Sequence, residues 1–445
     1  MKVGFSICDI TPETGIYLTG YGIPERLAEG VHSPLHATVM CLQEEDKIAV
    51  VIGVDWCYVD TELVEAIGRG IEEKTGIPRK YILLSCSHTH SAPHTCTEKT
   101  WGRTDVDPEW KGVKYVYDHI PAFADAVMQA KENLRECKAG FGHGHTETGV
   151  SRRGTDENGV VTGFRQDPYQ IYDSNMTVAY FRDAETDEDL GIFVHASSHN
   201  TCMGLSRLIS SDWCGLMRKR IRDRYQNVPV LFLNGAIGDV GPRTNFYMAH
   251  RNSFSGGVGT EVVSVDEVGY RAASDALRIL DGIRDFRAAL PLKIHVGELS
   301  LPQRLSMTEE QANNVLADLD GLSAEEKKVC GEYLIAQAVA AAYKEPLQPE
   351  LKLPLTLIAF GPMALVPYPF EVFSIFSLRL RQYGPFEYTL LTSNSNGAYS
   401  YMPDRGAFAA GGYEASCIRS YRAYVIQPEA GDVAVTQTLA QLRQM

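Results

Sequence analysis

Residues Lys80–His94, KYILLSCSHTHSAPH, decide the fold that we expect of the whole sequence. The apolar run Tyr81–Leu84 is typical of a buried β-strand. Histidines then follow among small polar residues, at His88, His90 and His94. Because open α/β sheets carry their chemistry beyond the carboxyl ends of the strands, we expect these histidines to contribute to a metal site.

Strand and helix patterns alternate along most of the chain. The predicted strands are Val3–Cys8, Thr38–Gln43, Ile48–Val54, Tyr81–Ser85, Met176–Phe181, Gly191–Ala196, Pro229–Leu233, Leu292–Leu299, Leu355–Phe360, Met363–Val366 and Thr389–Thr392. The predicted helices are Thr61–Lys74, Val116–Arg135, Trp213–Tyr225, Asp266–Ile283, Thr308–Leu316, Ala324–Tyr343, Val372–Gln382 and Asp432–Gln444. This alternation predicts an α/β fold with a mostly buried β-sheet flanked by helices. A hairpin pattern around the EED turn near residue 45 indicates that the sheet is mixed.

No Pro- or Ser-rich linker divides the 445 residues, so we expect a single domain over 1–445. Residues 306–347, rich in Ala, Glu and Lys, predict a helical insertion packed on the outside. The long irregular stretches 95–107 and 251–260 are of the kind that forms lids or rims.

The composition excludes several classes of partner. Lys and Arg number 42 against 56 Asp and Glu, giving a net charge of −14 with no basic run, which argues against nucleic acid and anionic membranes. No signal-peptide pattern and no apolar run of membrane-spanning length is visible, so we expect a cytoplasmic protein without stable membrane association. The 10 cysteines lack CxxC spacing and are expected to be reduced. A small-molecule substrate is the expected partner, and the oligomeric state, homo-oligomer included, is left open.

A second predicted strand also ends in histidines, in Phe193–Asn200, FVHASSHN. His195 and His199 have the spacing that chelates a metal on a helix, but Ala-Ser-Ser after a strand forms helix poorly. His199 is therefore only an alternative ligand. Two strands that end in histidines indicate one shared site more strongly than either does alone.

Two further segments carry residues that suit a metal site. Glu371, in LVPYPFEVF, is either a metal ligand or an acid that complements the start of a helix. The segment Ser393–Glu414 is dense in Gly, Asn and Tyr, and its tyrosines either pack in turns or ligate a cation or stabilise an oxyanion. No GxSxG, Walker or HExxH motif is present.

Taken in order, these motifs resemble the catalytic domain of the neutral, non-lysosomal ceramidase family. HTHSAP resembles the family's HTHSGP motif, and looser matches follow in DITPETGIYLTGYG, HASSHNTCMGLSRLISSD, NGAIGDVGP, PFE and YMPDRGAFAAGGYE. The resemblance covers the catalytic domain and not the family's carboxyl-terminal sandwich domain. Because that domain and a secretion signal have no counterpart here, we expect a small soluble substrate rather than membrane ceramide.

The resemblance implies one Zn²⁺ and a set of residues around it. The implied metal ligands are His88, His195, Glu371 and Tyr401, and the implied contacts of the scissile group are His90, Arg152 and Tyr413. Arg153 competes with Arg152 because the match around VSRRG is short. His94 is left as a residue at the rim of the site.

The sequence thus predicts a zinc-dependent hydrolase that cleaves the amide C–N bond of a small soluble acyl-amide with metal-activated water. Gly241 stands where the family has a serine once favoured as nucleophile, which supports water as the nucleophile. The alternatives are a metal-dependent lyase or hydrolase acting on an ester or carbohydrate derivative, and a metal-bearing binding protein without turnover.

Overall fold

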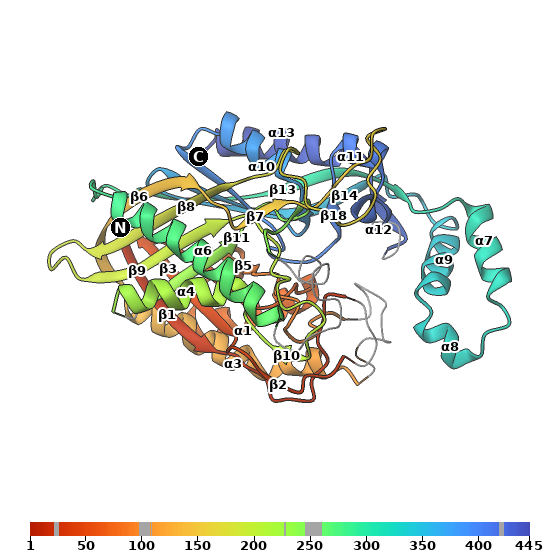
Figure 1. The fold of residues 1–445 in the computed structure, drawn as a ribbon, viewed down its shortest axis with the longest axis horizontal. Coiled ribbons are helices and arrows are strands. Elements are labelled where there is room, and N and C mark those ends of the chain that lie inside the picture. The colour runs from red at the N-terminus through yellow and green to blue at the C-terminus, as the bar shows by residue number, and fades with distance from the viewer. Residues whose placement is uncertain (22–25, 98–106, 108, 227, 245–259, 418–421) are drawn as a thin grey trace.

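The computed structural model describes residues 1–21, 26–97, 107, 109–226, 228–244, 260–417 and 422–445. The fold is α/β, as the sequence predicts. Two β-sheets pack face to face, and helices cover the outer face of each sheet (Figure 1). The predicted segments 95–107 and 251–260 lie largely outside the described residues.

The larger sheet has eight strands in the order β11-β9-β8-β6-β1-β3-β4-β5. In chain order its strands are β1 (Lys2–Asp9), β3 (His36–Glu44), β4 (Lys47–Val54), β5 (Ile82–Cys86), β6 (Arg135–His145), β8 (Asn175–Asp183), β9 (Asp189–Ala196) and β11 (Val230–Asn234). β4 pairs with β5 and β9 with β11 in parallel, whereas β3 and β4 form the predicted antiparallel hairpin. The prediction of a mixed sheet is therefore confirmed.

Both faces of this sheet are apolar, which explains the nearly continuous apolar run of strands such as β4. Val50 and Ile52 of β4 face helices α1 (Thr61–Thr75) and α3 (Lys111–Glu132). Val51, between them, faces the second sheet. On the same outer face, α4 (Asp212–Arg224) and α6 (Thr260–Gly282) cover β8, β9 and β11.

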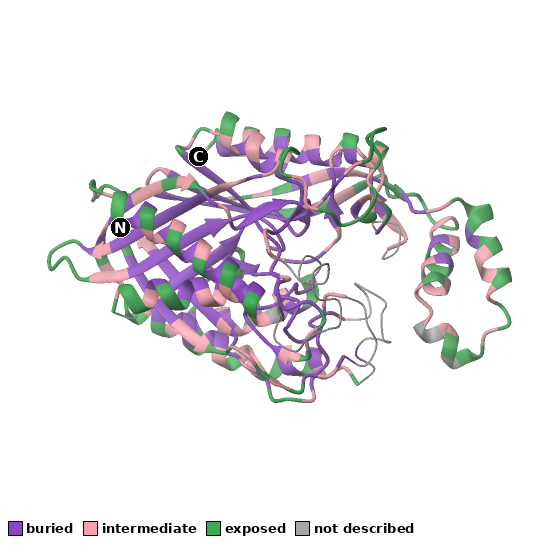
Figure 2. Ribbon diagram, viewed as in Figure 1, coloured by how far each residue is buried: buried purple, intermediate pink, exposed green. Residues whose placement is uncertain are grey.

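The smaller sheet has five strands in the order β17-β15-β14-β13-β19. These are β13 (Leu292–Leu305), β14 (Glu350–Phe360), β15 (Met363–Pro367), β17 (Tyr388–Thr392) and β19 (Tyr424–Ile426). One face contacts the larger sheet, and the other is covered by α10 (Ser374–Tyr383) and α13 (Ala430–Leu442). Figure 2 shows the buried residues concentrated on the strands between the helix layers.

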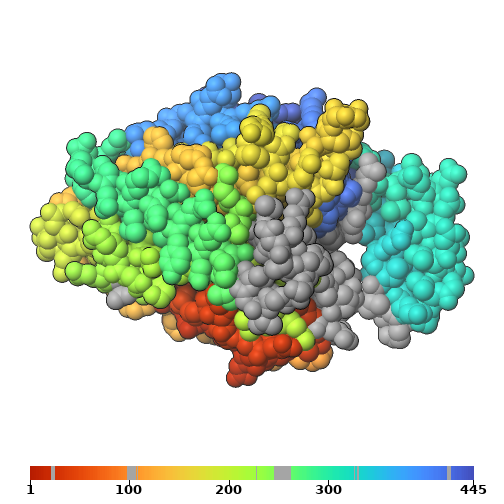
Figure 3. All heavy atoms as spheres, viewed as in Figure 1, coloured from red at the N-terminus to blue at the C-terminus, as the bar shows by residue number. Residues whose placement is uncertain are grey.

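Three helices interrupt the hairpin of β13 and β14: α7 (Glu309–Asp318), α8 (Ala324–Val329) and α9 (Gly331–Ala342). They lie within the segment predicted to be a helical insertion, and the predicted helix Ala324–Tyr343 is divided at Cys330. These three helices form an arm, which has a small core of its own made of Leu305, Ala312, Ala336 and Val339. It stands out at one end of the molecule (Figures 1 and 3). A single domain over 1–445 stays a prediction.

Every predicted strand is present, but several elements were not predicted. β6 was missed because its sequence, RECKAGFGHGH, mixes glycine, charge and histidine. Short elements also escaped prediction: β2 (Gly30–Val31), η1 (Arg79–Tyr81), β7 (Gly149–Ser151), β10 (Leu208–Ile209), β12 (Val240–Pro242), β16 (Glu371–Val372), β18 (Tyr401–Met402), α11 (Arg405–Ala410) and α12 (Tyr413–Cys417). Among the described helices, none has both the length and the apolar character that crossing a bilayer requires.

Candidate metal centre

The site lies where the two sheets are tied together at the carboxyl ends of their parallel strands. The segment after β17 makes these ties: the Ser393 N–H donates to the Asn234 carbonyl (3.1 Å), and the Cys86 N–H donates to the Asn394 carbonyl (3.1 Å). Residues that follow β5, β9 and β15 are thereby brought to one place. This is the location predicted from the strand ends.

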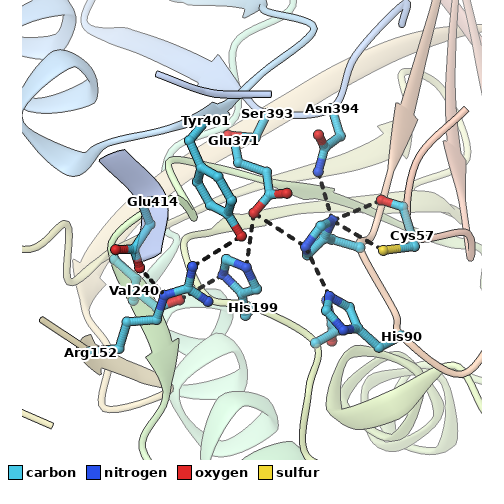
Figure 4. A network of polar contacts seen from close by, with 12 residues as sticks. Cys57, His90, Arg152, His199, Val240, Glu371, Ser393, Asn394, Tyr401 and Glu414 are labelled. Carbon is cyan, nitrogen blue, oxygen red and sulfur yellow. Dashed lines mark hydrogen bonds and ion pairs between the residues drawn. The ribbon is translucent and has the colours of Figure 1, made fainter. Parts of the chain in front are cut away.

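Three buried side chains converge there: His88, His199 and Glu371. Figure 4 labels His199 and Glu371 of this group. Glu371 Oε2 lies 3.0 Å from His199 Nε2 and 3.5 Å from His88 Nε2. They come from the segments after β5, after β9 and after β15. Two imidazoles and a carboxylate are a donor set typical of zinc.

The tautomers indicate that both imidazoles direct a lone pair at the carboxylate. His199 Nδ1 lies 3.0 Å from the Val240 carbonyl oxygen, and His88 Nδ1 lies 2.9 Å from the Cys57 carbonyl oxygen. A carbonyl only accepts, so each Nδ1 carries the proton and each Nε2 does not. The Asn394 amide nitrogen faces the same His88 Nδ1 at 2.8 Å. Because a protonated Nδ1 cannot accept from it, and amide ends are assigned from their partners, we exchange the two ends and place the oxygen there.

Two of the converging atoms, His199 Nε2 and Glu371 Oε2, have no hydrogen-bond partner in the described part of the chain. Both are buried acceptors, an arrangement that is costly unless a cation lies between them. Burial lowers the pKa of His199 to about 3 and also lowers that of His88. Burial alone would raise the pKa of Glu371, but His88, His199 and Arg152 lower it to about 2. The donors are thus in their metal-binding forms at neutral pH, and the residues fit a divalent metal.

The backbone at His88 explains how two residues of the HTH motif reach one site. An extended strand would send His88 and His90 to opposite faces. His88 has a φ of 69°, in the left-handed region, so the chain turns there. The two rings are 4.8 Å apart, and His90 Nε2 lies 3.1 Å from His88 Nε2. His90 Nδ1 has no partner among the described residues.

Tyr401 and Arg152 border the converging donors on the side away from His90 (Figure 4). Glu371 in β16 pairs in parallel with Tyr401 in β18, which places the two side by side. Arg152 follows β7, and its N–H donates to the Asp239 carbonyl (2.9 Å), next to the carbonyl that holds His199. Arg152 Nη2 donates to Tyr401 Oη at 3.1 Å. Burial and the charge of Glu371 raise the pKa of Tyr401 in the metal-free site.

The structure brings most of the predicted site residues together: His88, and the residues labelled in Figure 4, His90, Arg152, Glu371 and Tyr401. Tyr413 lies at the outer edge, 44% exposed, with its ring 5.8 Å from that of Tyr401. His94 is buried rather than at a rim, and its Nδ1 lies 3.1 Å from Thr19 Oγ1.

The predicted ligand His195 lies apart from these residues, whereas the alternative, His199, belongs to the group that could hold a metal. His195 is still inside β9, between Thr177 of β8 and Leu233 of β11. Its Nε2–H donates to the Leu391 carbonyl of β17 at 2.7 Å, so it bridges the two sheets. His199 comes three residues after the end of β9, where the chain has left the sheet. The histidine that reaches the site is therefore the one beyond the end of β9, His199, and not the one within the strand, His195.

Comparison with known proteins agrees with this geometry. Residues 1–255 match the model of the neutral/alkaline non-lysosomal ceramidase family, N-terminal. The chain belongs to this ceramidase family. Two curated relatives from Arabidopsis thaliana are neutral ceramidase 2, 23% identical over 239 residues, and neutral ceramidase 1, 24% identical over 238 residues. These alignments cover 51% and 50% of this chain but only 30% and 29% of the relatives.

The ceramidase fold is shared over nearly the full chain. The crystal structure of neutral ceramidase from Pseudomonas aeruginosa matches 99% of this chain and 74% of its own, with a TM-score of 0.72 at 19% identity. A structure described as ceramidase complexed with C2 gives a TM-score of 0.70 at 17% identity. The chain thus combines membership of this family with a buried His/Glu cluster that could hold a metal.

Several residues around the centre were not singled out from the sequence. Val240 contributes a backbone carbonyl, which any residue type would offer, so no sequence signal marked it. Cys57 contributes a carbonyl and a sulfur that lies 3.6 Å from His88 Nδ1, but it is one of 10 scattered cysteines. Asn394 lies in a turn-rich SNSN run that resembles an ordinary loop. Glu414 is buried between Arg152 and Arg153, and its position next to Tyr413 was the only available hint.

Proposed function

We propose that this ceramidase-family protein is a zinc-dependent amidase that cleaves the C–N bond of a small soluble acyl-amide. The observation that carries the proposal is the convergence of two imidazole lone pairs and a carboxylate on one point, beside an arginine and a tyrosine. The metal ligands in this proposal are His88, His199, Glu371 and Tyr401.

Zinc bound at these residues would acidify a water molecule and polarise the carbonyl of the amide. The chain's own residues supply the rest of the chemistry. His90 lies beside His88 with Nδ1 free among the described residues, and it would move a proton between the attacking water and the leaving nitrogen. Burial lowers the pKa of His90 well below its ordinary value, so it begins the reaction neutral.

Arg152 would stabilise the oxyanion that develops on the carbonyl. Its Nη1 makes no hydrogen bond within the described part of the chain. It remains protonated because Tyr401, Glu414 and Glu371 raise its pKa by more than burial lowers it. Tyr413, at the exposed edge, would contact the substrate next to Arg152. Removing one oxyanion donor commonly costs about 100- to 1,000-fold in kcat.

The proposal is tested by metal analysis combined with an amine-release screen. The purified protein is assayed on short N-acyl amides, long N-acyl amides and ceramide in detergent micelles, before and after chelation. We expect about one zinc per chain, amine release that is lost on chelation and restored by zinc, and a preference for short soluble amides. Full zinc occupancy without release of amine from any amide would contradict the proposal.

The same screen separates the two alternatives. A lyase would give an unsaturated product without amine, and an esterase would release alcohol from matched esters. A binding protein would retain a ligand without turnover. The position of His90 beside His88 and of Arg152 beside Tyr401 favours catalysis, because both side chains border the proposed metal ligands.

A further inference from the structure

The two adjacent arginines of the VSRRG stretch have different surroundings. Arg152 reaches Tyr401 Oη through Nη2, and its guanidinium lies 5.6 Å from the Tyr401 ring centre. Arg153 points the other way: its Nη2 donates to the Gly411 carbonyl (2.7 Å), and its guanidinium lies 5.1 Å from the Phe373 ring centre. The ambiguity between the two arginines is thereby decided in favour of Arg152 as the one that faces the centre.

One carboxylate joins them. Glu414 is 1% exposed; its Oε1 accepts from Arg152 Nε at 2.9 Å, and its Oε2 forms a short ion pair with Arg153 Nη1. Figure 4 shows Glu414 on the side of Arg152 away from the histidines. Each carboxylate oxygen is thus paired with one of the two arginines.

The segment that carries Glu414 is fitted closely to Arg153. Gly411 and Gly412 have φ values of 71° and 94°, which favour glycine. A Cβ on Gly412 would lie 3.1 Å from Arg153 Nη1 and 2.8 Å from Val161 Cγ1. Arg153 therefore fixes the start of α12, and with it the position of the Glu414 carboxylate.

We propose that Glu414 is a positioning residue that, held by Arg153, orients the Arg152 guanidinium so that Nη2 meets Tyr401 and Nη1 faces the substrate oxyanion. This inference rests on the proposed function. A long arginine side chain has many rotamers, and an ion pair at Nε restricts them before substrate arrives. Loss of Glu414 would leave the charge of Arg152 in place and remove its orientation.

The test compares Glu414→Gln, Glu414→Asp and the charge-balanced double variant Arg153→Met/Glu414→Gln with a control, Asp173→Asn. Asp173 is likewise buried and paired with an arginine, at 2.6 Å from Arg381, but does not contact the site. Two readouts are measured on the zinc-loaded proteins: steady-state amide hydrolysis, and calorimetric binding of butylphosphonate, a tetrahedral oxyanion probe. Zinc content is measured in every variant.

We expect Glu414→Gln to retain zinc, to lose about 10- to 100-fold in kcat with KM changed less than about 3-fold, and to bind the phosphonate at least about 10-fold more weakly. Glu414→Asp keeps the charge and should recover part of both losses. If Glu414→Gln fails to fold, the double variant carries the test with the same expected losses, because it removes one charge of each sign.

Unchanged kcat and unchanged phosphonate affinity in a zinc-loaded Glu414→Gln protein would overturn the proposal. So would equal losses in Asp173→Asn, since they would reflect the loss of any buried carboxylate. Failure of the proposed function is distinguishable: the unmodified protein would then hydrolyse no amide, whereas phosphonate binding would still report on the orientation of Arg152.

Discussion

Replacing the two histidines of the FVHASSHN segment distinguishes the metal position from a structural one. In His199→Asn, the amide nitrogen of Asn can replace Nδ1 as donor to the Val240 carbonyl, while the atom that faces Glu371, Nε2, is lost. In His195→Gln, the amide nitrogen can replace Nε2 as donor to the Leu391 carbonyl. Each variant keeps the backbone contact, and only one of them removes a converging donor.

The expected magnitude follows from the number of donors. Apparent zinc-binding free energies of about 10–16 kcal/mol in structural sites, divided over four donors, give about 2.5–4 kcal/mol for each. At 1.4 kcal/mol per factor of ten, His199→Asn should weaken zinc binding by about 100-fold or more. His195→Gln should bind zinc within about 3-fold of the unmodified protein.

The assay is zinc affinity measured by competition with a chromogenic chelator, with zinc content by elemental analysis and thermal unfolding of the zinc-free proteins as a check on folding. Amide hydrolysis should follow zinc occupancy. Unchanged zinc affinity in His199→Asn, or loss of zinc in a folded His195→Gln protein, would refute the assignment of the donors.

Two further predictions concern stability, and a third concerns zinc affinity. Burial lowers the pKa of His195 to about 4, from about 6.5 in the unfolded chain, so the unfolded chain binds more protons below pH 6.5. The stability that is present above pH 6.5 is therefore lost as the pH falls toward 4, and at pH 4.5 the loss is about 2–3 kcal/mol. Urea titrations should show a smaller loss in His195→Gln. A Cβ on Gly112 would lie 1.9 Å from the His94 carbonyl oxygen, whereas one on Gly282 would meet nothing within 4 Å, so Gly112→Ala should lower the melting temperature and Gly282→Ala should not. Replacing residues 306–347 by a short turn should keep zinc affinity, because β13 and β14 are paired up to Pro302 and Glu350 without the arm; loss of zinc binding in that variant would show that the arm supports the centre.

The fold could be predicted because its signals are local. Strands such as β4 and β5 are buried on both faces and therefore appear as uninterrupted apolar runs, and the helices that cover them have an apolar face at helical spacing. β6 escaped because its glycines serve close packing: a Cβ on Gly140 would lie 2.3 Å from a side-chain carbon of Ile283. The packing partner of such a strand is not visible in its own sequence.

The sequence alone determined which strands end in histidine and acid, and hence that a candidate metal site lies at the edge where parallel strands terminate. Only the tertiary structure decided which of these residues meet. His195 and His199 are close in the sequence. Which of them faces the site depends on where β9 ends and on the hydrogen bond of His195 to Leu391 of the other sheet. Likewise, His88, with its left-handed backbone, contacts Asn394, which lies hundreds of residues away in the sequence. Glu371 pairs with Tyr401, which lies tens of residues away. Composition and local pattern carry no record of those contacts, because each joins segments that are separated in the sequence.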